Sequence, residues 1–367
     1  MKSAASDGTR AGSPGVAGAI TAASDARLAA LEDWLRRDLG RAVQRVEVAS
    51  ADASFRRYFR AVLADGATLI VMDAPPDKED IQPYLKVARL LESIGAHVPH
   101  VHATDLGRGY VLLEDLGSTP LLGQLKSGGD VEALYGDALA ALAGIQARGG
   151  EAARELPSYD APVLEREMQL MPQWFCARHL GFEPDAAELA LLRGTFDFLI
   201  AECLAQPVVF VHRDYHSRNL MVTPKRSPGI IDFQDALAGP VGYDLVSLLK
   251  DCYVHWPRAR VEGWVRDYRS RLRAAGFAAG TGTSEREFLR WFDLVGVQRH
   301  VKVLGIFARL WHRDGKIGYL DDLPLTLDYV RDTSARYPEL REFALWLERR
   351  IVPQLPAANA RARATPA

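Results

Sequence analysis

The sequence predicts an α+β protein with two lobes, in which a small antiparallel β lobe precedes a mostly helical lobe. Strand-like runs of β-branched and aromatic residues gather before about residue 117, and helical periodicity dominates from about residue 130 onward. A short β-rich island between residues 208 and 232 interrupts the helical part. The 367 residues are too many for one compact core, which supports a division into two lobes.

Both ends of the chain have a composition that does not favour a packed core. Residues 1–24 are rich in Ala, Gly and Ser, so we expect a disordered leader there. The segment 356–367 is similar in composition and is predicted to be a flexible tail. These limits leave an N-lobe over residues 25–117 and a helical C-lobe over residues 118–355.

The N-lobe is predicted to contain two helices and a group of strands. Leu28, Leu31 and Trp34 recur near the helical period and Gly40 follows them, which predicts a helix over about residues 25–39. An Asp-Gly pair between two β-rich runs predicts a hairpin. The other N-lobe elements are expected at the following positions: strands at 46–48, 57–63, 68–72 and 111–113, and a helix at 80–94.

The C-lobe is predicted to be mostly helical. Apolar residues recur at the helical period over seven segments, which are 131–147, 162–180, 185–205, 241–255, 257–274, 284–314 and 338–352. Short apolar runs predict three strands, at 208–212, 220–222 and 230–232. In the helix near residues 291–311, one stripe is expected to lie in the core, formed by Val297, Val301, Leu304, Ala308 and Trp311.

Charge, hydropathy and cysteine content exclude several classes of protein. The formal net charge is −2, so neither a nucleic acid nor a membrane surface is expected as the principal partner. No run approaches the roughly 18–20 continuous apolar residues that a membrane helix needs. Cys176, Cys203 and Cys252 are odd in number and widely spaced, which predicts neither a disulfide framework nor a zinc site and suits the cytoplasm.

The densest group of chemically active side chains lies in the segment VVFVHRDYHSRNLMV, residues 208–222. An apolar strand leads to Asp214, Asn219 follows in the next loop, and Asp232 comes at the end of a further strand. Phosphoryl transfer needs a group that accepts the proton of the attacking hydroxyl, and oxygen ligands for Mg²⁺. We therefore interpret Asp214 as the catalytic base, and Asn219 and Asp232 as magnesium ligands.

Two sequence patterns support this interpretation. The string H-R-D-x-x-x-x-N, from His212 to Asn219, matches the catalytic loop of protein kinases, and Asp232-Phe233-Gln234 follows an apolar strand as the D-F-G element does. Taken singly, the first pattern could be a turn with a buried ion pair, and Asp232 could be a helix cap. These alternatives do not explain both patterns at this spacing. The match implies a protein-kinase-like fold with ATP and Mg²⁺ as cofactors, in which His212 supports the loop.

The segment that follows narrows the class of substrate. From His212 to Asp244 the chain resembles the aminoglycoside phosphotransferase and choline kinase superfamily of small-molecule kinases. In that superfamily an aspartate at the start of the next helix hydrogen-bonds the catalytic loop, which implies this role for Asp244, although a simple helix N-cap is the alternative. The long activation loop and the A-P-E segment of protein kinases are missing, so a protein substrate is not expected.

The N-lobe departs from the protein-kinase pattern at the nucleotide. In place of a G-x-G-x-x-G loop the chain has ADASFRRYFR, residues 51–60, whose small residues would let backbone N–H groups approach phosphate. Ser54, Arg56 and Arg57 are the candidate phosphate ligands, and strand alternation puts the two arginines on opposite faces. The strand at 68–72 carries no lysine, so either an arginine of this loop or Lys78 has to replace it.

A candidate hinge closes the N-lobe. Glu114-Asp115-Leu116-Gly117 follows an apolar strand and matches the kinase segment whose backbone groups bind adenine. Glu114 and Leu116 are therefore the candidate adenine-binding positions. An ordinary turn from a strand to a helix is the alternative.

A narrower resemblance rests on four segments, ADASFRRYFR, VMDAPPDKEDIQPYLKVARLL, VLLEDLG and VQRHVKVLGIFARLWHRDG. Between about residues 25 and 350 the chain resembles the bacterial N-acetylmuramate/N-acetylglucosamine kinases of cell-wall recycling. The resemblance implies cytoplasmic, ATP-dependent phosphorylation of an amino sugar at its anomeric hydroxyl. Composition and spacing by themselves reach only to a small-molecule hydroxyl.

Three cations are candidates for contact with the sugar. Arg299, His300 and Lys302 lie off the apolar stripe of their helix and could meet either an acidic sugar or water. This basic run favours a neutral or acidic sugar over the cationic acceptors of aminoglycoside and choline kinases. The missing lysine and glycine loop also leave open a nucleotide-binding scaffold without turnover, which the intact catalytic residues oppose. The preferred sugar and the oligomeric state stay open.

Overall fold

The computed structural model describes residues 26–51, 55–277 and 282–364 of the chain. The predicted leader 1–24 and the candidate phosphate ligand Ser54 lie outside the described residues. The chain divides into two compact units. The first contains the chain up to Glu79 together with Ala103–Leu113, and the second contains Asp80–His102 together with the chain from Glu114 onward.

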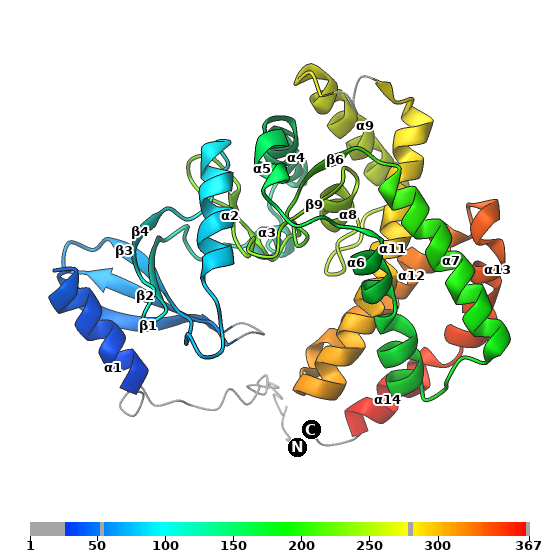
Figure 1. Cartoon of the computed structure of the whole chain (residues 1–367), viewed down its shortest axis with the longest axis horizontal. Coiled ribbons are helices and arrows are strands. Elements are labelled where there is room, and N and C mark those ends of the chain that lie inside the picture. Colours follow the sequence, from blue (N-terminus) through cyan, green and yellow to red (C-terminus); the bar gives the residue numbers. More distant parts are fainter. Residues whose placement is uncertain (1–25, 52–54, 278–281, 365–367) are drawn as a thin grey trace, which may run out of the picture. The chain divides into compact units, whose positions relative to one another are not determined.

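The first unit is built on a five-stranded sheet in the order β1-β2-β3-β5-β4 (Figure 1). Strands β1 and β2, and strands β2 and β3, pair antiparallel. The turn between β2 and β3 contains Gly66 with φ +86°, a conformation that glycine adopts without a steric penalty, so the predicted hairpin is confirmed. The strands are β1 (Val43–Ala51), β2 (Arg57–Leu63), β3 (Thr68–Asp73), β4 (Val101–Asp105) and β5 (Tyr110–Glu114).

One helix covers a face of this sheet. Helix α1 (Ala26–Asp33) continues as the π-helical turn η2 (Trp34–Asp38), which confirms the helix predicted over 25–39. Leu31 and Trp34 pack against Phe59 and other apolar residues of the sheet. Strand β4 was not predicted, because its sequence VHATD contains only one large aliphatic residue and no strong turn signal.

The helix predicted at 80–94 forms as α2 (Gln82–Ser93), but it belongs to the second unit. The ring of Tyr84 stacks on that of Phe233 with centroids 4.9 Å apart, and Lys86 donates a hydrogen bond to the carbonyl oxygen of Glu155. The two compact units thus divide the chain differently from the predicted lobes over residues 80–102. Packing of the apolar face of α2 decides its unit, and sequence order does not show which surface it will cover.

The second unit is mostly helical, and its helices begin where the sequence offers a capping side chain. Asp130, Asp160 and Ser284 accept hydrogen bonds from backbone N–H groups of the first turn, and Asp185 forms a capping box with Glu188. The helices are α3 (Leu121–Lys126), α4 (Val131–Arg148), α5 (Gly150–Arg154), α6 (Ala161–Met168), η3 (Met171–Leu180), α7 (Ala186–Leu204), α8 (Tyr243–Leu249), α9 (Arg258–Ala274), α11 (Glu285–Asp314), η4 (Ile317–Asp322), α12 (Leu323–Ser334), η5 (Pro338–Leu340), α13 (Arg341–Trp346), η6 (Leu347–Ile351) and α14 (Leu355–Ala364).

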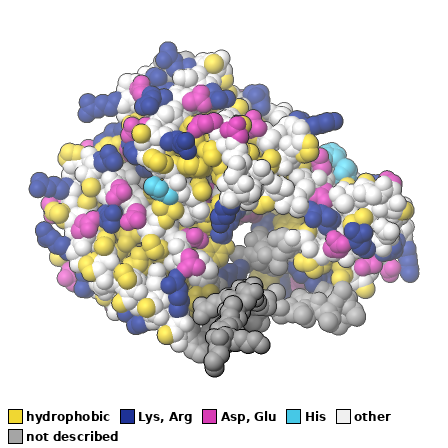
Figure 2. Space-filling view, turned by 180° about the vertical axis from the view of Figure 1, so that it is seen from behind, with side chains coloured by type: hydrophobic (Ala, Val, Ile, Leu, Met, Phe, Trp, Pro, Cys, Tyr) yellow, Lys and Arg dark blue, Asp and Glu magenta, His cyan; other side chains and the backbone are white. Residues whose placement is uncertain are grey.

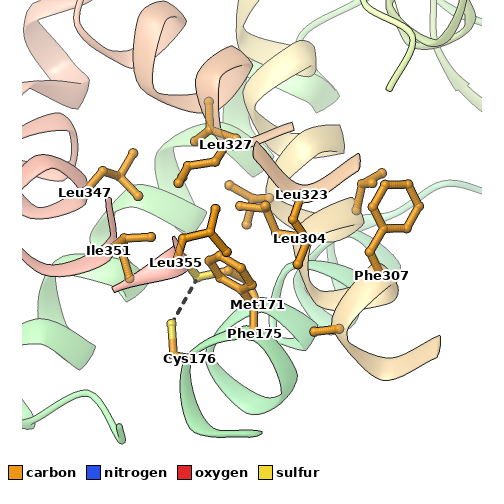
Figure 3. Close-up of a cluster of buried hydrophobic side chains, with 14 of the residues drawn as sticks. Met171, Phe175, Cys176, Leu304, Phe307, Leu323, Leu327, Leu347, Ile351 and Leu355 are labelled. Atoms are coloured by element: carbon orange, nitrogen blue, oxygen red, sulfur yellow. Dashed lines mark hydrogen bonds between the residues drawn. The ribbon is translucent and has the colours of Figure 1, made fainter. Parts of the chain in front are cut away.

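The core of the second unit lies around the long helix α11, with α12, η3 and α14 packed nearby (Figures 1 and 3). Figure 3 shows Leu304 of α11 among side chains from η3, α12 and the C-terminal helices. The backbones of α11 and η3 approach closely at Gly305, where an added Cβ would lie 2.3 Å from the carbonyl carbon of Leu170. The stripe predicted to be core, from Val297 to Trp311, is buried as expected.

The C-terminal segment differs from the prediction of a flexible tail over 356–367. Residues up to Ala364 form α14, in which Leu355, Ala358 and Ala362 are buried against the core of the second unit. Alanine is the strongest helix former, and the spacing of these apolar residues by three and four positions gives this helix a packing face that composition alone does not show. Helix α12 was also not predicted, and the helix expected over 241–255 ends early, at Leu249.

Among the described helices, none is long and apolar enough to span a bilayer. On the face seen in Figure 2, Lys and Arg side chains are interspersed with Asp and Glu side chains. This mixed surface accords with the net charge of −2.

Candidate active site

Two short antiparallel sheets of two strands each position the predicted catalytic residues. Strand β6 (Val208–Val211) pairs with β9 (Leu237–Pro240), and β7 (Leu220–Met221) pairs with β8 (Gly229–Ile230). The loop of residues 212–219 therefore leaves β6 and enters β7, while the loop of residues 231–236 leaves β8 and enters β9. The two loops are joined by the hydrogen bond from Ile231 N–H to the carbonyl oxygen of Asn219, at 3.0 Å.

A buried carboxylate holds the start of the catalytic loop, which we define as residues 212–219. Asp244, in the first turn of α8, accepts hydrogen bonds from the backbone N–H of His212 at 2.7 Å and of Arg213 at 3.0 Å. Burial raises the pKa of Asp244 to about 7, and the two N–H donors counteract that rise. The geometry matches the loop-supporting role that the resemblance implied for Asp244.

His212 ties the two loops together. Its Nε2 lies 3.1 Å from the carbonyl oxygen of Ile231, and its Nδ1 accepts a hydrogen bond from Asp214 N–H at 3.2 Å. These partners require a neutral ring with the proton on Nε2. Burial lowers the pKa of His212 to about 4, which keeps the ring in that neutral form.

Asn219 and Asp232 lie side by side. The Asn219 side-chain amide donates to Asp232 Oδ2 at 3.2 Å and to the carbonyl oxygen of Asp214 at 3.1 Å. Gln234 donates to the other carboxylate oxygen of Asp232 at 2.8 Å. Asp232 has φ +64°, a left-handed conformation that a non-glycine residue adopts only when its surroundings enforce it.

This donor set suits magnesium. Mg²⁺ prefers oxygen ligands and takes one or two from the protein, with water and phosphate completing an octahedron. The Asp232 carboxylate and the side-chain carbonyl of Asn219 supply two such oxygens within one hydrogen-bonded group. Among the described residues, no group of three or more His, Cys, Asp or Glu side chains could hold a metal without further ligands. An ion held there would take its remaining ligands from phosphate or water.

Positive charges surround Asp214. Burial by itself would raise its pKa, but Lys302, His216, Arg299 and Arg213 exert a larger opposing effect and lower it. The carboxylate is therefore ionised at neutral pH and can accept a hydrogen bond from a hydroxyl group.

A buried ionic cluster lies behind the loop and was not predicted. Glu167 of α6 forms ion pairs with Arg213 and with Lys302 of α11, whose Nζ is 3.0 Å away. The Tyr159 hydroxyl donates a hydrogen bond to Glu167, and Lys302 donates one to the Tyr243 hydroxyl at 3.0 Å. Burial favours the neutral acid, but Lys302 and Arg213 outweigh it and lower the pKa of Glu167. Lys302, a predicted sugar contact, is thus engaged beneath the loop.

The other two predicted sugar contacts are also enclosed. His300 is fully buried, and its ring nitrogens lie 2.7 Å and 2.8 Å from the carbonyl oxygens of Gly296 and Lys250. Arg299 is 4% exposed and places Nη1 3.9 Å from the Cys252 sulfur, while its Nε has no hydrogen-bond partner among the described residues. Both side chains face the interior beside α8 and do not line a surface.

A second carboxylate holds the far half of the catalytic loop. Asp251 accepts hydrogen bonds from the backbone N–H of Ser217 at 3.0 Å and of Tyr253 at 3.1 Å. Neither Asp251 nor Glu167 belongs to a recognisable sequence motif. The one sequence signal that could have singled out Asp251 is a carboxylate at the end of the mostly apolar segment LVSLLKDC.

The candidate nucleotide residues fall in both units. In the first unit, Arg57 donates from Nε to the buried Asp73 at 3.1 Å and lies over the Phe59 ring. Arg56 and Arg57 are both half-buried. In the second unit, Glu114 N–H donates to the carbonyl oxygen of His100 at 2.9 Å, and Leu116 is 8% exposed.

The fold and the constellation of Asp214, Asn219 and Asp232 define the class of the protein, a kinase-like phosphotransferase. Solved structures of low sequence identity share the fold. An ADP-bound aminoglycoside phosphotransferase APH(2'')-Ib aligns with a TM-score of 0.56 at 12% identity, covering 83% of this chain and 98% of its own. Choline kinase LicA from Streptococcus pneumoniae aligns with a TM-score of 0.58 at 13% identity, covering 84% and 99%. The predicted kinase-like fold is confirmed.

Sequence comparison places the chain more closely. Residues 45–292 match the profile of the Phosphotransferase enzyme family, and the chain belongs to that family. A protein from Pseudomonas aeruginosa named N-acetylmuramate/N-acetylglucosamine kinase is 49% identical over 80% of this chain and 85% of its own length. A protein of the same name from Neisseria meningitidis is 45% identical over 87% of this chain and 94% of its own. The predicted relationship is confirmed.

Proposed function

We propose that the chain transfers the γ-phosphoryl group of ATP to the anomeric hydroxyl of N-acetylmuramate or N-acetylglucosamine, in cell-wall recycling. The observation that carries the proposal is the 49% and 45% identity, over most of the chain, to relatives named for these two sugars. The constellation of Asp214, Asn219 and Asp232 supplies the matching chemistry. The position on the sugar and the recycling role follow from the resemblance.

Asp214 acts as the base. The hydroxyl of the acceptor donates a hydrogen bond to the ionised carboxylate and transfers its proton as the oxygen–phosphorus bond forms. A positioned base contributes roughly 10²- to 10⁴-fold to the rate of such a step. The hydrogen bonds of Asp244 and Asp251 to the backbone keep the carboxylate in place during the reaction.

Asn219 and Asp232 hold the magnesium ion. Bound there, the ion neutralises charge on the phosphate groups of ATP. Gln234 hydrogen-bonds the Asp232 carboxylate at 2.8 Å and so restricts its orientation toward the ion.

The nucleotide contacts are assigned to Ser54, Arg56 and Arg57 for phosphate, and to the backbone at Glu114 and Leu116 for adenine. Arg57 also pairs with the buried Asp73. All three cysteines are buried without disulfides, which supports a reducing, cytoplasmic location.

A coupled assay of ADP release tests the function. The purified chain with MgATP is offered N-acetylmuramate, N-acetylglucosamine, choline and kanamycin in parallel. We expect turnover with the amino sugars, and a ³¹P NMR spectrum of the product that shows a phosphate bonded to the anomeric carbon. Turnover with choline or kanamycin alone would replace the proposal with another small-molecule kinase, and ATP binding without any turnover would indicate a scaffold.

A further inference from the structure

The three predicted sugar contacts on α11 are buried, but the catalytic loop carries an exposed cation, Arg218. Arg218 immediately precedes the metal ligand Asn219, and its side chain is 42% exposed. Lys302 is buried and Arg213 is half-buried, and both form ion pairs with the Glu167 carboxylate. Arg299 is only 4% exposed. Arg218 is therefore the accessible arginine of this loop, and its one ion pair, with Asp322, is too long for a hydrogen bond.

The guanidinium of Arg218 is held by aromatic rings. Its Cζ lies 3.5 Å from the centroid of the Tyr253 ring and 5.9 Å from that of Tyr319. A guanidinium stacked on a ring keeps its planar edge, with the N–H donors, directed sideways. The nearest carboxylate oxygen, in Asp322, is 3.9 Å from Nη2, which is beyond hydrogen-bond distance. Among the described residues, Arg218 makes no hydrogen bond.

The Tyr253 ring, on which Arg218 stacks, is linked by hydrogen bonds to the loop that carries Asp214. Tyr253 N–H donates to Asp251, the same carboxylate that holds Ser217 of the loop. The rings of His216 and Tyr253 meet edge to face with centroids 5.4 Å apart. Asp214, His216 and Arg218 alternate along the loop, so one rigid segment positions both the base and the stacked guanidinium.

We propose that Arg218 binds the carboxylate of an acidic acceptor sugar and so distinguishes N-acetylmuramate, which carries a lactyl carboxylate, from the neutral N-acetylglucosamine. The inference rests on the proposed function. A planar guanidinium with unused, parallel N–H donors is the side chain best suited to a carboxylate, because two hydrogen bonds form at once. Tyr253 and Tyr319 restrict its rotation, so little conformational entropy is lost on binding.

The test compares the wild-type chain with Arg218→Gln on three acceptors: N-acetylmuramate, its uncharged carboxamide and N-acetylglucosamine. We expect kcat/KM for the acid to fall about 10- to 100-fold, the range for a lost charge-assisted hydrogen-bonded pair. The same substitution should change kcat/KM for the carboxamide and for N-acetylglucosamine by less than about threefold. Arg218→Lys, which keeps the charge and loses the fork, should lie between wild type and Arg218→Gln for the acid only.

Matched measurements separate recognition from structure. Arg349→Gln removes an exposed arginine of η6 and should leave all three acceptors unaffected. Thermal unfolding and the KM for ATP of Arg218→Gln should equal those of wild type. Three results for Arg218→Gln would overturn the inference and leave the proposed kinase intact: an equal loss on all three acceptors, an unchanged rate with the acid, or an equal loss on the acid and on its carboxamide. A wild-type chain that phosphorylates no amino sugar would overturn both.

Discussion

Arg213 shows how single residues set the shape of the catalytic loop. Its φ of +77° is costly for a side chain with a Cβ, by about 1–3 kcal/mol. Its N–H is bound by Asp244 and its guanidinium by Glu167, so both ends of the residue are fixed. Asp214 follows directly, and its orientation depends on these contacts. The surroundings thus enforce a strained backbone next to the catalytic base.

Replacing Asp214 tests the base. Asp214→Asn keeps the size of the side chain and removes the carboxylate, so turnover should fall by roughly 10²- to 10⁴-fold. ATP affinity should stay close to wild type, because Asn219 and Asp232 are unchanged. ADP release gives the rate and calorimetric titration gives the affinity. Near-normal turnover would exclude Asp214 as the base.

Replacing Glu167 tests the buried cluster. Glu167→Gln leaves Lys302 and Arg213 enclosed without their shared anion, and breaking a buried ion pair costs about 3–5 kcal/mol. We expect a lower kcat because the loop is less well positioned, with KM for MgATP changed little. Denaturant unfolding and steady-state kinetics measure the two effects. Glu151→Gln, on the exposed face of α5, is the control.

A loss of stability without a change in kcat would show that Glu167 only stabilises the fold. A parallel rise in KM for MgATP would point to a general distortion of the site. Only a fall in kcat at nearly constant KM assigns Glu167 a positioning role.

The sequence predicted site residues that belong to one local segment and missed those that act across the fold. His212, Asp214 and Asn219 share a loop, so their fixed spacing is visible in the chain. Glu167 reaches Arg213 across 46 positions of sequence, and no spacing rule covers such a contact. Side-chain exposure, which separates Arg218 from Arg299, is a property of packing and cannot be read from either residue.

At the scale of elements, α11 shows why the burial of the predicted sugar contacts Arg299, His300 and Lys302 could not be foreseen. Its apolar stripe is buried as predicted, but the opposite face is buried too and carries charged residues. A helix enclosed on several sides can hold charges when each finds a partner, as Lys302 does with Glu167. Charged residues off the stripe therefore resemble a solvated face in the sequence although they lie inside.

Asp293 of α11 links this helix to its neighbours. It is 1% exposed and pairs with Lys250, next to α8, at 3.1 Å and with Arg258, at the start of α9, at 2.5 Å. The Tyr337 hydroxyl donates to it at 2.9 Å. Burial opposes ionisation, but Lys250 and Arg258 outweigh it and lower the pKa of Asp293 to about 2.

Asp293→Asn should destabilise the second unit by about 3–5 kcal/mol at pH 7, because Lys250 remains buried without its counter-ion. The folded pKa lies below the unfolded value of 3.8, so the ion pairs stabilise the wild type fully above about pH 5 and this contribution is lost as pH falls toward 2. The difference in unfolding free energy between wild type and variant should therefore shrink by about 2 kcal/mol over that range.

Urea unfolding at pH 7, 5 and 2 measures this difference. Asp267→Asn, in an exposed pair with Arg271 on α9, should change stability by only a few tenths of a kcal/mol at each pH. A gap between wild type and Asp293→Asn that stays constant with pH would contradict the assigned pKa.

At the scale of the whole molecule, the fold class could be predicted from the order of the elements, but the limits of the two units could not. The β-rich start and the helical remainder are local patterns, and both were predicted. The assignment of α2 to the second unit and the packing of α14 depend on which apolar faces meet. Tyr84 on Phe233 and Ala358 in the core of the second unit are contacts between distant segments.

Ligand binding should stabilise the whole chain in a way that depends on magnesium. MgATP at about 100 times its Kd raises the unfolding free energy by about 2.7 kcal/mol, because only the folded chain binds it. Removal of magnesium with a chelator should abolish most of this gain, since Asn219 and Asp232 then face unneutralised phosphate.

Asp232→Asn should reduce the magnesium-dependent gain, whereas Asp137→Asn, on the exposed face of α4, should keep it. Thermal unfolding midpoints with ATP, with and without magnesium, measure these differences. An undiminished magnesium-dependent shift in Asp232→Asn would mean that the ion is held elsewhere.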